Sequence, residues 1–482
     1  MIAGPLLLLI IPLAMAGIVY ILLRWEFLSA LLATGTALTL GIAVVTLPLD
    51  QPVQPFSFLG GDHQIAMGEA VTFFGRELVL EQADRMAMAF LFLTAAGLFF
   101  LAWRFAPHSL LFPMGLALLS LLSSALLIRP LIYAALLIEI AAALSIFALQ
   151  AEGQPPTRGG LRYLTFTTMA LPGLLVTHWL MERYAVTPDE TGLLSMTASL
   201  LTISFALLLG AVPFHTWVPA IVGNSVPLAG IFVLTVNNGA IWFLLLDFLE
   251  TYPWLSSHPR FGPLVTAAGL AMAIVGGLLA LAQRRLGSLV GYGALVDSGC
   301  ALMALGMNSR LGLTLVFLSL LVRPFGLTLM AAGLSGLWAL NGNDDRFDAL
   351  RGLGRKAPWS TMALIFGGLS VIGLPTSAGF VWRWALYRTL ASPNPGSALC
   401  LLLTEIGVMI GMWRGVFALL MRPRPSEGNR SPRITSEGWL TAAVVAVAIL
   451  GCIGVGFFPQ TLAPLAARLA DTIPSLLPDG PI

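Results

Sequence analysis

Charged side chains are scarce in this chain of 482 residues. Asp, Glu, Lys and Arg together make up 10% of it, and Lys356 is the one lysine among 25 basic residues. Hydrophobic residues reach 57% and the mean hydropathy is +0.89, which excludes an ordinary soluble globular domain. The net charge of +2 gives no sign of a nucleic-acid partner. The composition therefore predicts a polytopic membrane protein of the all-α class.

Cysteine is also rare, and Cys300, Cys400 and Cys452 lie in apolar segments far apart in the sequence. Their spacing fits neither a metal site nor a redox pair, so we interpret them as small core residues. The sequence contains no phosphate-binding loop, dinucleotide fingerprint or zinc motif. We therefore expect this chain to bind no cofactor and no metal.

Long apolar runs fill most of the chain, and a bilayer-spanning helix needs about 20 mostly apolar residues. Fourteen runs qualify, at about 2–23, 27–47, 86–103, 109–128, 131–150, 162–181, 192–212, 225–247, 263–282, 289–307, 311–337, 360–388, 398–421 and 438–458. The first run has no basic region before it and no small-residue cleavage site after it. We interpret it as a retained span and not as a signal peptide.

Basic residues in the connections predict the orientation of these spans. If the N-terminus lies outside, the inward connections hold 14 Arg and Lys and the outward connections hold eight. Because such residues concentrate on the cytoplasmic side of a membrane, both termini are predicted on the periplasmic face of the inner membrane of a bacterium. The outward segment 48–85 agrees, since it holds six acidic residues beside Arg76 and Arg85.

Ionisable residues inside the spans are the first functional candidates, because a charge in hydrocarbon is costly and is retained for a reason. Five stand out: Glu139, Asp297, Arg323, Arg383 and Glu405. For each of them, the alternative to a functional role is a buried pair that fixes helix packing. Glu139 is the only charge of its span and has no obvious basic partner in its own half of the chain.

Two spans are interrupted by residues that break helices. Pro213 and Pro219 flank His215 in one span, and Gly373, Pro375 and Gly379 interrupt the other. Irregular backbone at membrane depth persists only where protein buries it or where it lines a polar cavity. Paired breaks in two halves point to an inverted-repeat transporter. His215 can exchange a proton near neutral pH, although a structural role in the turn stays open.

Three segments outside the spans have a readable pattern. The sequence VTFFGRELVL at 71–80 predicts strands ahead of the third span. The charged segment 340–358 is interpreted as a solvated loop, with partner docking as the alternative. The tail from residue 459 is expected to form a short interfacial helix at most.

Taken in order, these features resemble the antiporter-like membrane subunits of respiratory complex I and their relatives in membrane-bound hydrogenases and cation/proton antiporters. The resemblance extends from about residue 80 to 420 and includes LEQADRMAMAF around Asp84, the lone Glu139, LRYLTFTTMALPG, PFHTWVP at 213–219, the spacing of Tyr292 and Gly299, and the break before Arg383. It implies an all-α fold with about 14 transmembrane helices, two inverted five-helix repeats and two discontinuous helices. The implied divisions are 1–108 with three spans and an outer loop, 109–250 and 263–421 for the repeats, and 422–482 with a basic inside loop, the last span and a tail.

The same resemblance implies proton translocation driven by a distant redox module. Glu139 matches the glutamate of the fifth span, His215 matches the turn histidine, and Arg383 stands where the twelfth span has a basic or acidic residue. Lysines are expected at three further positions, which hold Leu208, Asn238 and Gly326. Arg323 lies three residues before the last of these, on nearly the same helix face, and can substitute there.

Replacing lysine by arginine changes the chemistry. An arginine keeps its proton at any accessible pH, so Arg323 and Arg383 can polarise their surroundings without shuttling protons. The groups that can shuttle protons are Glu139, His178, His215, Asp297 and Glu405. With Asn238 and the two arginines, the proton-path candidates are therefore Glu139, His215, Asn238, Asp297, Arg323, Arg383 and Glu405.

We predict a proton-translocating, antiporter-like membrane subunit of a complex I-type oxidoreductase that passes electrons from NADH or another donor to quinone on other subunits. Its expected partners are those membrane subunits, the lipid bilayer and protons, with sodium as an alternative ion. Asn238 leaves open a subunit of a multisubunit cation/proton antiporter or membrane-bound hydrogenase. Leu208 leaves open a structural spacer that no longer conducts protons.

Overall fold

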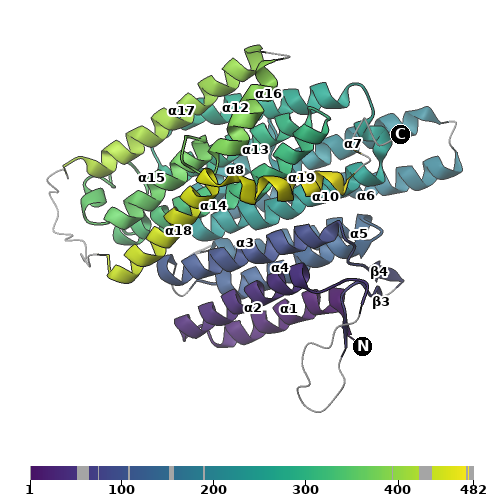
Figure 1. Ribbon diagram of the computed structural model, residues 1–482, viewed down its shortest axis with the longest axis horizontal. Coiled ribbons are helices and arrows are strands. Elements are labelled where there is room, and N and C mark those ends of the chain that lie inside the picture. Colours follow the sequence, from purple (N-terminus) through teal and green to yellow (C-terminus); the bar gives the residue numbers. More distant parts are fainter. Residues whose placement is uncertain are drawn as a thin grey trace.

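The computed structural model describes residues 2–51, 64–73, 75–106, 109–150, 157–187, 190–392, 395–422, 437–473 and 476. The described chain is a bundle of long helices that lie side by side (Figure 1), as expected because lipid offers no partner for backbone N–H and C=O groups. Helices from the start of the chain form one side of the bundle and the green helices of the second half form the other.

The helices of the first part of the chain belong to two packed pairs. Its elements are β1 (Ile2–Ala3), α1 (Gly4–Ile21), α2 (Glu26–Thr46), β2 (Ile65–Ala66), β3 (Val71–Phe73), β4 (Arg76–Leu78) and α3 (Asp84–Phe105). Helix α2 packs on α3, and α1 packs on α4 (Leu111–Leu127) of the next part. Strands β3 and β4 lie in the segment predicted to form strands and pair antiparallel, with Val71 opposite Leu78, and β4 also pairs with β5 (Ile128–Arg129).

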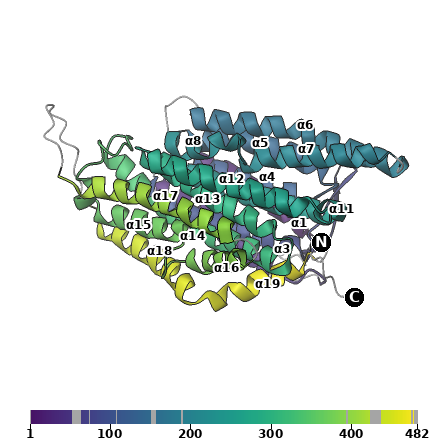
Figure 2. The ribbon, with the colours of Figure 1, turned by 90° about the horizontal axis from the view of Figure 1, so that it is seen from above.

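The next part contains the first broken helix. Its elements are α5 (Ile132–Leu149), α6 (Arg158–Val186), α7 (Thr191–Leu209), η1 (Phe214–Thr216), α8 (Trp217–Asn224), α9 (Pro227–Phe232), the π-helical turn η2 (Val233–Asn237), α10 (Asn238–Thr251) and α11 (Pro253–Ser256). Helices α6 and α7 lie along one edge of the bundle (Figure 2). The segment from α9 to α10 is buried from Pro227 to Leu246, whereas Asp247 and Glu250 near its end are half-buried.

The second half contains the other broken helix. Its elements are α12 (Phe261–Ala282), α13 (Leu286–Leu305), α14 (Arg310–Leu340), η3 (Leu353–Arg355), α15 (Pro358–Ile372), α16 (Phe380–Ala391) and α17 (Pro395–Leu420). Helices α13 and α14 are its buried centre, and they join the two halves because α13 packs on α8 and α14 packs on α9 and α3.

The chain ends with α18 (Trp439–Phe457), η4 (Pro459–Thr461) and α19 (Ala463–Asp471). Helix α19 lies along α14 (Figures 1 and 2), so the expected short helix of the tail exists and is packed on the bundle. Arg310 at the start of α14 donates to Asp471 through Nε at 2.7 Å and Nη2 at 2.8 Å.

Twelve helical segments of the described residues are long and apolar enough to span a membrane. The shorter apolar helices α4 and α15 match the remaining two of the fourteen predicted runs. The all-α polytopic fold is therefore confirmed, with two discontinuous helices as predicted. The domain boundaries and the inverted relation of the two repeats stay predictions.

The charged segment before α15 is exposed at Arg346, Asp348, Arg355 and Lys356, as expected of a solvated loop, but it also carries one buried carboxylate. Asp345 is buried and accepts hydrogen bonds from Arg285 Nε at 2.7 Å and from the backbone N–H of Gly287 at 2.9 Å. The segment therefore closes the end of α13 through its own contacts. A buried carboxylate needs such partners, so Asp345 serves internal packing while most charged side chains of the segment are exposed.

Candidate functional site

In both broken helices, the helix before the break ends at a glycine. Gly210 after α7 and Gly373 after α15 have positive φ values of 70° and 77°, which glycine adopts without strain. Each break leaves helix-terminal carbonyl groups without an intrahelical partner. In the first break Trp217 Nε1 donates to the Leu207 carbonyl at 3.3 Å, whereas in the second a guanidinium takes this role.

That guanidinium belongs to Arg383 on α16, which is 1% exposed. Its Nη2 donates to the Val371 carbonyl at 3.0 Å and to Asp297 Oδ1 at 2.9 Å. Its Nη1 forms an ion pair with Glu405 of α17 and lies 3.1 Å from Cys300 Sγ. One arginine thus joins the helix break to two acidic side chains on two other helices.

Arg323 on α14 extends this cluster towards the first half. Its Nε lies 3.4 Å from Asp297 Oδ2, and its Nη2 donates to Ser298 Oγ at 2.7 Å and to the Ala294 carbonyl at 3.3 Å. Its Nη1 donates to Asn238 Oδ1 at 3.3 Å. We call Asn238, Asp297, Arg323, Arg383 and Glu405 the central network. All five side chains are buried, and its two arginines and two carboxylates give no net charge when all are ionised.

A π-helical turn places the last member of the central network. Turn η2 ends at Asn237, which is followed directly by Asn238 at the start of α10. Asn237 Nδ2 donates to Ser145 Oγ on α5 at 2.8 Å and to Tyr163 Oη on α6 at 3.5 Å. Single π turns are often found at functional sites. Here two adjacent amides contact different halves of the protein, one towards α5 and α6 and the other towards Arg323.

Glu139 lies beside this first-half set. It is half-buried on α5 and accepts a hydrogen bond of 2.5 Å from Thr168 Oγ1 on α6. Its Oε2 is buried without a hydrogen-bond partner among the described residues. Tyr163 on α6 is near enough to interact with it electrostatically. Glu139 is thus separate from the central network, with Tyr163 and Asn237 between them.

The two histidine candidates lie outside the central network. His215 is half-buried in η1, and its Nδ1 is buried without a partner in the described part of the chain. His178 Nε2 on α6 lies 3.1 Å from the exposed Glu182 one turn later. The structure therefore brings together five of the seven proton-path candidates and leaves Glu139 and His215 apart.

Sequence reasoning missed several members of this region. Asn237, Tyr163 and Ser145 are neutral, so the search for charges passed over them. The signal for one of them was visible, because two adjacent amides stand in the apolar run VLTVNNGAIW. Tyr387 was also missed: its buried hydroxyl lies beside Glu405 and interacts with that carboxyl group.

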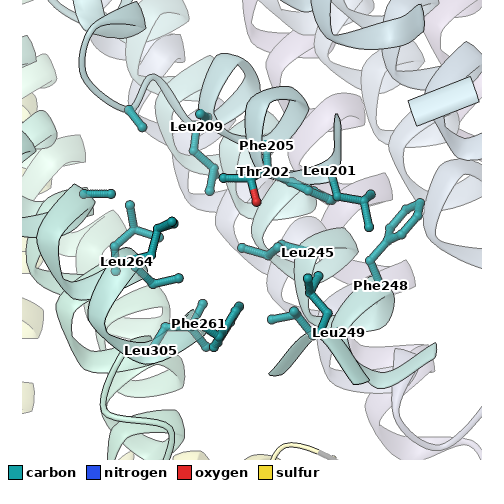
Figure 3. Close-up of a pocket in the computed structure, with 16 residues that line it drawn as sticks. Leu201, Thr202, Phe205, Leu209, Leu245, Phe248, Leu249, Phe261, Leu264 and Leu305 are labelled. Atoms are coloured by element: carbon teal, nitrogen blue, oxygen red, sulfur yellow. The ribbon is translucent and has the colours of Figure 1, made fainter. Parts of the chain in front are cut away.

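Two cavities help to delimit the site. A cavity of about 100 Å³ lies between α7, α10, α12 and α13, and Figure 3 shows its apolar lining by residues such as Phe205, Phe248 and Leu264. No charged side chain lines it, so it offers no proton carrier. A larger cavity of about 590 Å³ between α15, α16 and α17 reaches Tyr387 and Glu405. The central network thus borders a cavity at one end.

The geometry limits what the central network can do. The two arginines stay protonated, so only Asp297 and Glu405 can gain and lose a proton there. Protonation of either carboxylate leaves a net positive charge in a buried site, which its neighbours must then compensate. Within the described residues no three His, Cys, Asp or Glu side chains are grouped as metal ligands. The arrangement fits proton exchange controlled by charge.

A sequence profile of the NADH:quinone oxidoreductase/Mrp antiporter transmembrane family matches residues 106–411. The chain belongs to this family. The resemblance drawn from the motifs is thereby confirmed, and the matched region contains every proton-path candidate.

Individual relatives are distant. The NADH-quinone oxidoreductase subunit N of Rhodococcus opacus is 24% identical over 304 residues, which cover 63% of this chain and 54% of that protein. Subunit N 1 of Solidesulfovibrio magneticus is 28% identical over 337 residues, which cover 67% of this chain and 71% of that protein. The chain thus matches little more than half the length of several of its relatives.

Solved structures resemble nearly the whole chain. A chain of the Mrp complex from Dietzia sp. superposes with a TM-score of 0.75 at 17% identity, covering 98% of this chain and 97% of that one. A chain of respiratory complex I from Thermus thermophilus superposes with a TM-score of 0.72 at 18% identity, covering 98% and 99%. At such identities the likeness establishes the fold.

Proposed function

We propose that this chain is a proton-translocating, antiporter-like membrane subunit of a complex I-type quinone oxidoreductase. Electrons pass from NADH or another donor to quinone on other subunits, and this chain moves protons without catalysing the redox step or holding a cofactor. Its partners are the other membrane subunits of that complex. It lies in the plasma membrane of a bacterium with both termini outside.

One observation carries this proposal. The central network holds two arginines and two carboxylates at 1–8% exposure; Asp297, Arg323 and Glu405 lie in the middle of long apolar helices, and Arg383 lies just after a helix break. Buried ion pairs add little to stability compared with apolar packing of the same volume, so their presence at membrane depth points to function. Asn238 extends the polar groups to Asn237, and Tyr163 continues them towards Glu139.

The network also suits control by a distant partner. While Arg383 is paired with Glu405, the carboxylate is stabilised in its ionised form. If the pair separates, Glu405 is left in apolar surroundings, where the neutral acid is favoured and a proton is taken up. A conformational change that opens and closes this pair therefore takes up and releases one proton per cycle, and the proton is translocated when it enters from one side of the membrane and leaves to the other.

Substitution of Glu405 by glutamine tests the proposal. We expect Glu405→Gln to lower proton translocation by about 100-fold, the low end of what a positioned acid–base group contributes. The assay is proton uptake into membrane vesicles, normalised to assembled complex. Glu190→Gln is the matched control because Glu190 pairs with Arg183 at the exposed end of α6. Unchanged translocation by the assembled Glu405→Gln complex would refute the proposal.

A second candidate function is that of a subunit in a multisubunit cation/proton antiporter. It is favoured by the neutral Asn238 where complex I subunits are expected to have lysine, and by the likeness to a chain of an Mrp complex. Transport that requires sodium would support this candidate. Transport that proceeds unchanged without sodium would support the complex I-type subunit.

The first half requires its own test, because Leu208 is buried in the core where a lysine is expected. If this half conducts protons, Glu139→Gln slows translocation while assembly is preserved. If the half is a structural spacer, the same variant translocates protons at the normal rate.

A further inference from the structure

A second group of acidic side chains lies away from the central network. Asp84 at the start of α3 and Asp247 and Glu250 near the end of α10 line one cavity of about 20 Å³. We call this the acidic pocket. A site needs about 10–15 Å³ to hold one water molecule, so the acidic pocket has room for one. Three carboxyl groups from two helices thus share a space suited to a hydrated proton.

The charges around the acidic pocket do not balance. Asp84 is buried, lies 3.5 Å from Arg129 Nη2 and accepts a hydrogen bond of 3.1 Å from the Glu81 backbone N–H. Within the described residues, no basic side chain forms an ion pair with Asp247 or Glu250. The other charged groups that act on Asp247 are Asp84, Glu250 and Glu81, which repel a negative charge, and Arg129.

Asp247 is therefore the carboxyl with the least compensation. Its side chain is half-buried near the end of a buried segment, and three of the four charged groups that act on it are acidic, so its ionised form is disfavoured. Binding a proton removes that charge. A carboxyl group in such surroundings takes up and releases a proton when its surroundings change.

The acidic pocket is covered by the last helix of the chain. Leu469 of α19, with Thr472 and Ile473 just after it, line the cavity. The ion pair between Arg310 and Asp471 fastens this segment to the start of α14 and is neutral as a unit. The cover thus contributes apolar side chains and one hydroxyl, and no net charge.

Two aromatic rings stand between the acidic pocket and the central network. Phe243 on α10 and Phe317 on α14 both line the pocket, and their ring centres are 6.3 Å apart. At 1.5 Å per residue, Asn238 lies about 7.5 Å before Phe243 along α10 and Arg323 lies about 9 Å beyond Phe317 along α14. The same two helices therefore carry the acidic pocket, the aromatic pair and the nearest members of the central network, in that order.

We propose that Asp247 is a proton-binding site, held as the neutral acid, through which the central network exchanges protons with the face of the membrane that α19 covers. The aromatic pair is the barrier between them, and the proton passes when water bridges it. This inference rests on the proposed function for its physiological meaning. The proton-binding site itself is a property of the pocket and is testable alone.

The first test detects the protonated acid directly. Dicyclohexylcarbodiimide adds to carboxylic acids in their protonated form in apolar surroundings, and mass spectrometry of the treated complex locates the modified residue. At neutral pH we expect modification of Asp247, with none of Asp84 in the same pocket because Asp84 is paired with Arg129. Absence of the modification, or equal modification of both residues, would overturn the proposal.

The second test measures transport. Asp247→Asn keeps the shape and neutrality of the protonated acid but cannot release a proton, so we expect proton translocation by the assembled complex to fall by about 100-fold. Phe243→Leu keeps the barrier apolar but makes it thinner, because leucine is smaller than phenylalanine. We expect this variant to translocate protons at a measurable rate that stays coupled to the redox reaction. A normal rate in Asp247→Asn would overturn the route.

The two proposals fail in different ways. If the complex translocates protons and Asp247 is not modified at neutral pH, the proposed function stands and the acidic pocket is not a proton-binding site. If Asp247 is modified but the wild-type complex does not translocate protons, the proton-binding site stands and the proposed function falls.

Discussion

Removal of the Arg383 guanidinium should lower the stability of the complex, and a second substitution should restore the stability without restoring proton translocation. Arg383→Leu deletes the ion pairs to Asp297 at 2.9 Å and to Glu405, together with the hydrogen bond to the Val371 carbonyl. Leucine fills part of the vacated volume, so the change is mainly electrostatic. Arg323 still compensates Asp297 at 3.4 Å, which leaves Glu405 as the unpaired acid.

The size of the effect follows from burial. Breaking a buried ion pair by removing one partner costs about 3–5 kcal/mol. We expect about 3 kcal/mol for Arg383→Leu, since Glu405 can take up a proton and Asp297 keeps a partner. In the double variant Arg383→Leu/Glu405→Leu one arginine and one carboxylate remain, and the charges balance again. Its stability should recover by about 3 kcal/mol, the upper end of coupling between contacting residues.

Thermal unfolding of the detergent-solubilised complex, followed by the loss of the assembled peak in size-exclusion chromatography, measures these differences. Arg388→Leu is the matched control because Arg388 is exposed on the same helix, and surface substitutions change stability by about 0.5 kcal/mol or less. The double variant should regain stability without regaining proton translocation. If Arg383→Leu and Arg388→Leu are equally stable, or if the two changes of the double variant are additive, the network is not a coupled unit.

Two further predictions concern local structure. Gly373→Ala should destabilise the complex by more than about 1 kcal/mol, because φ is 77° and a Cβ would lie 2.7 Å from Arg383 Cγ; Gly97→Ala, where a Cβ meets nothing within 4 Å, should not destabilise it. The hydrogen bonds from Arg310 hold the pKa of Asp471 below the usual value for an aspartate side chain, which is about 3.9. A lowered folded-state pKa means that the pair stabilises α19 fully above about pH 4 and less as pH falls through the folded value. The protection of the α19 amides, expressed relative to their intrinsic exchange rate at each pH, should therefore be constant from neutral to mildly acidic pH and fall below it; a loss of protection that begins near neutral pH would contradict this.

Much of the fold was predictable because the bilayer restricts the options. All fourteen apolar runs became helices, since backbone polar groups in lipid must be satisfied within a helix or a closed barrel. The two breaks were visible as proline and glycine within those runs. The strand character of 71–80 was predictable from the sequence, although the pairing of 77–78 with 128–129 was not, because no local signal links segments so far apart.

The candidate site was predictable in its charges and not in its connections. Mid-span charges are rare, so Asp297, Arg323, Arg383 and Glu405 were found from their positions within apolar runs. Which of them form pairs depends on helix packing across the bundle, which a single sequence does not specify. The acidic pocket was missed because Asp247 and Glu250 stand near the end of a span, where acids are ordinary.

The adjacent amides Asn237 and Asn238 have a mechanical consequence. One amide is tied to α5 and α6 and the next to α14, while the backbone between them is a single π turn. Rotation of that turn displaces both amides together, so neither half can rearrange there without moving the other. The turn therefore links movements of α5 and α6 mechanically to movements of α14.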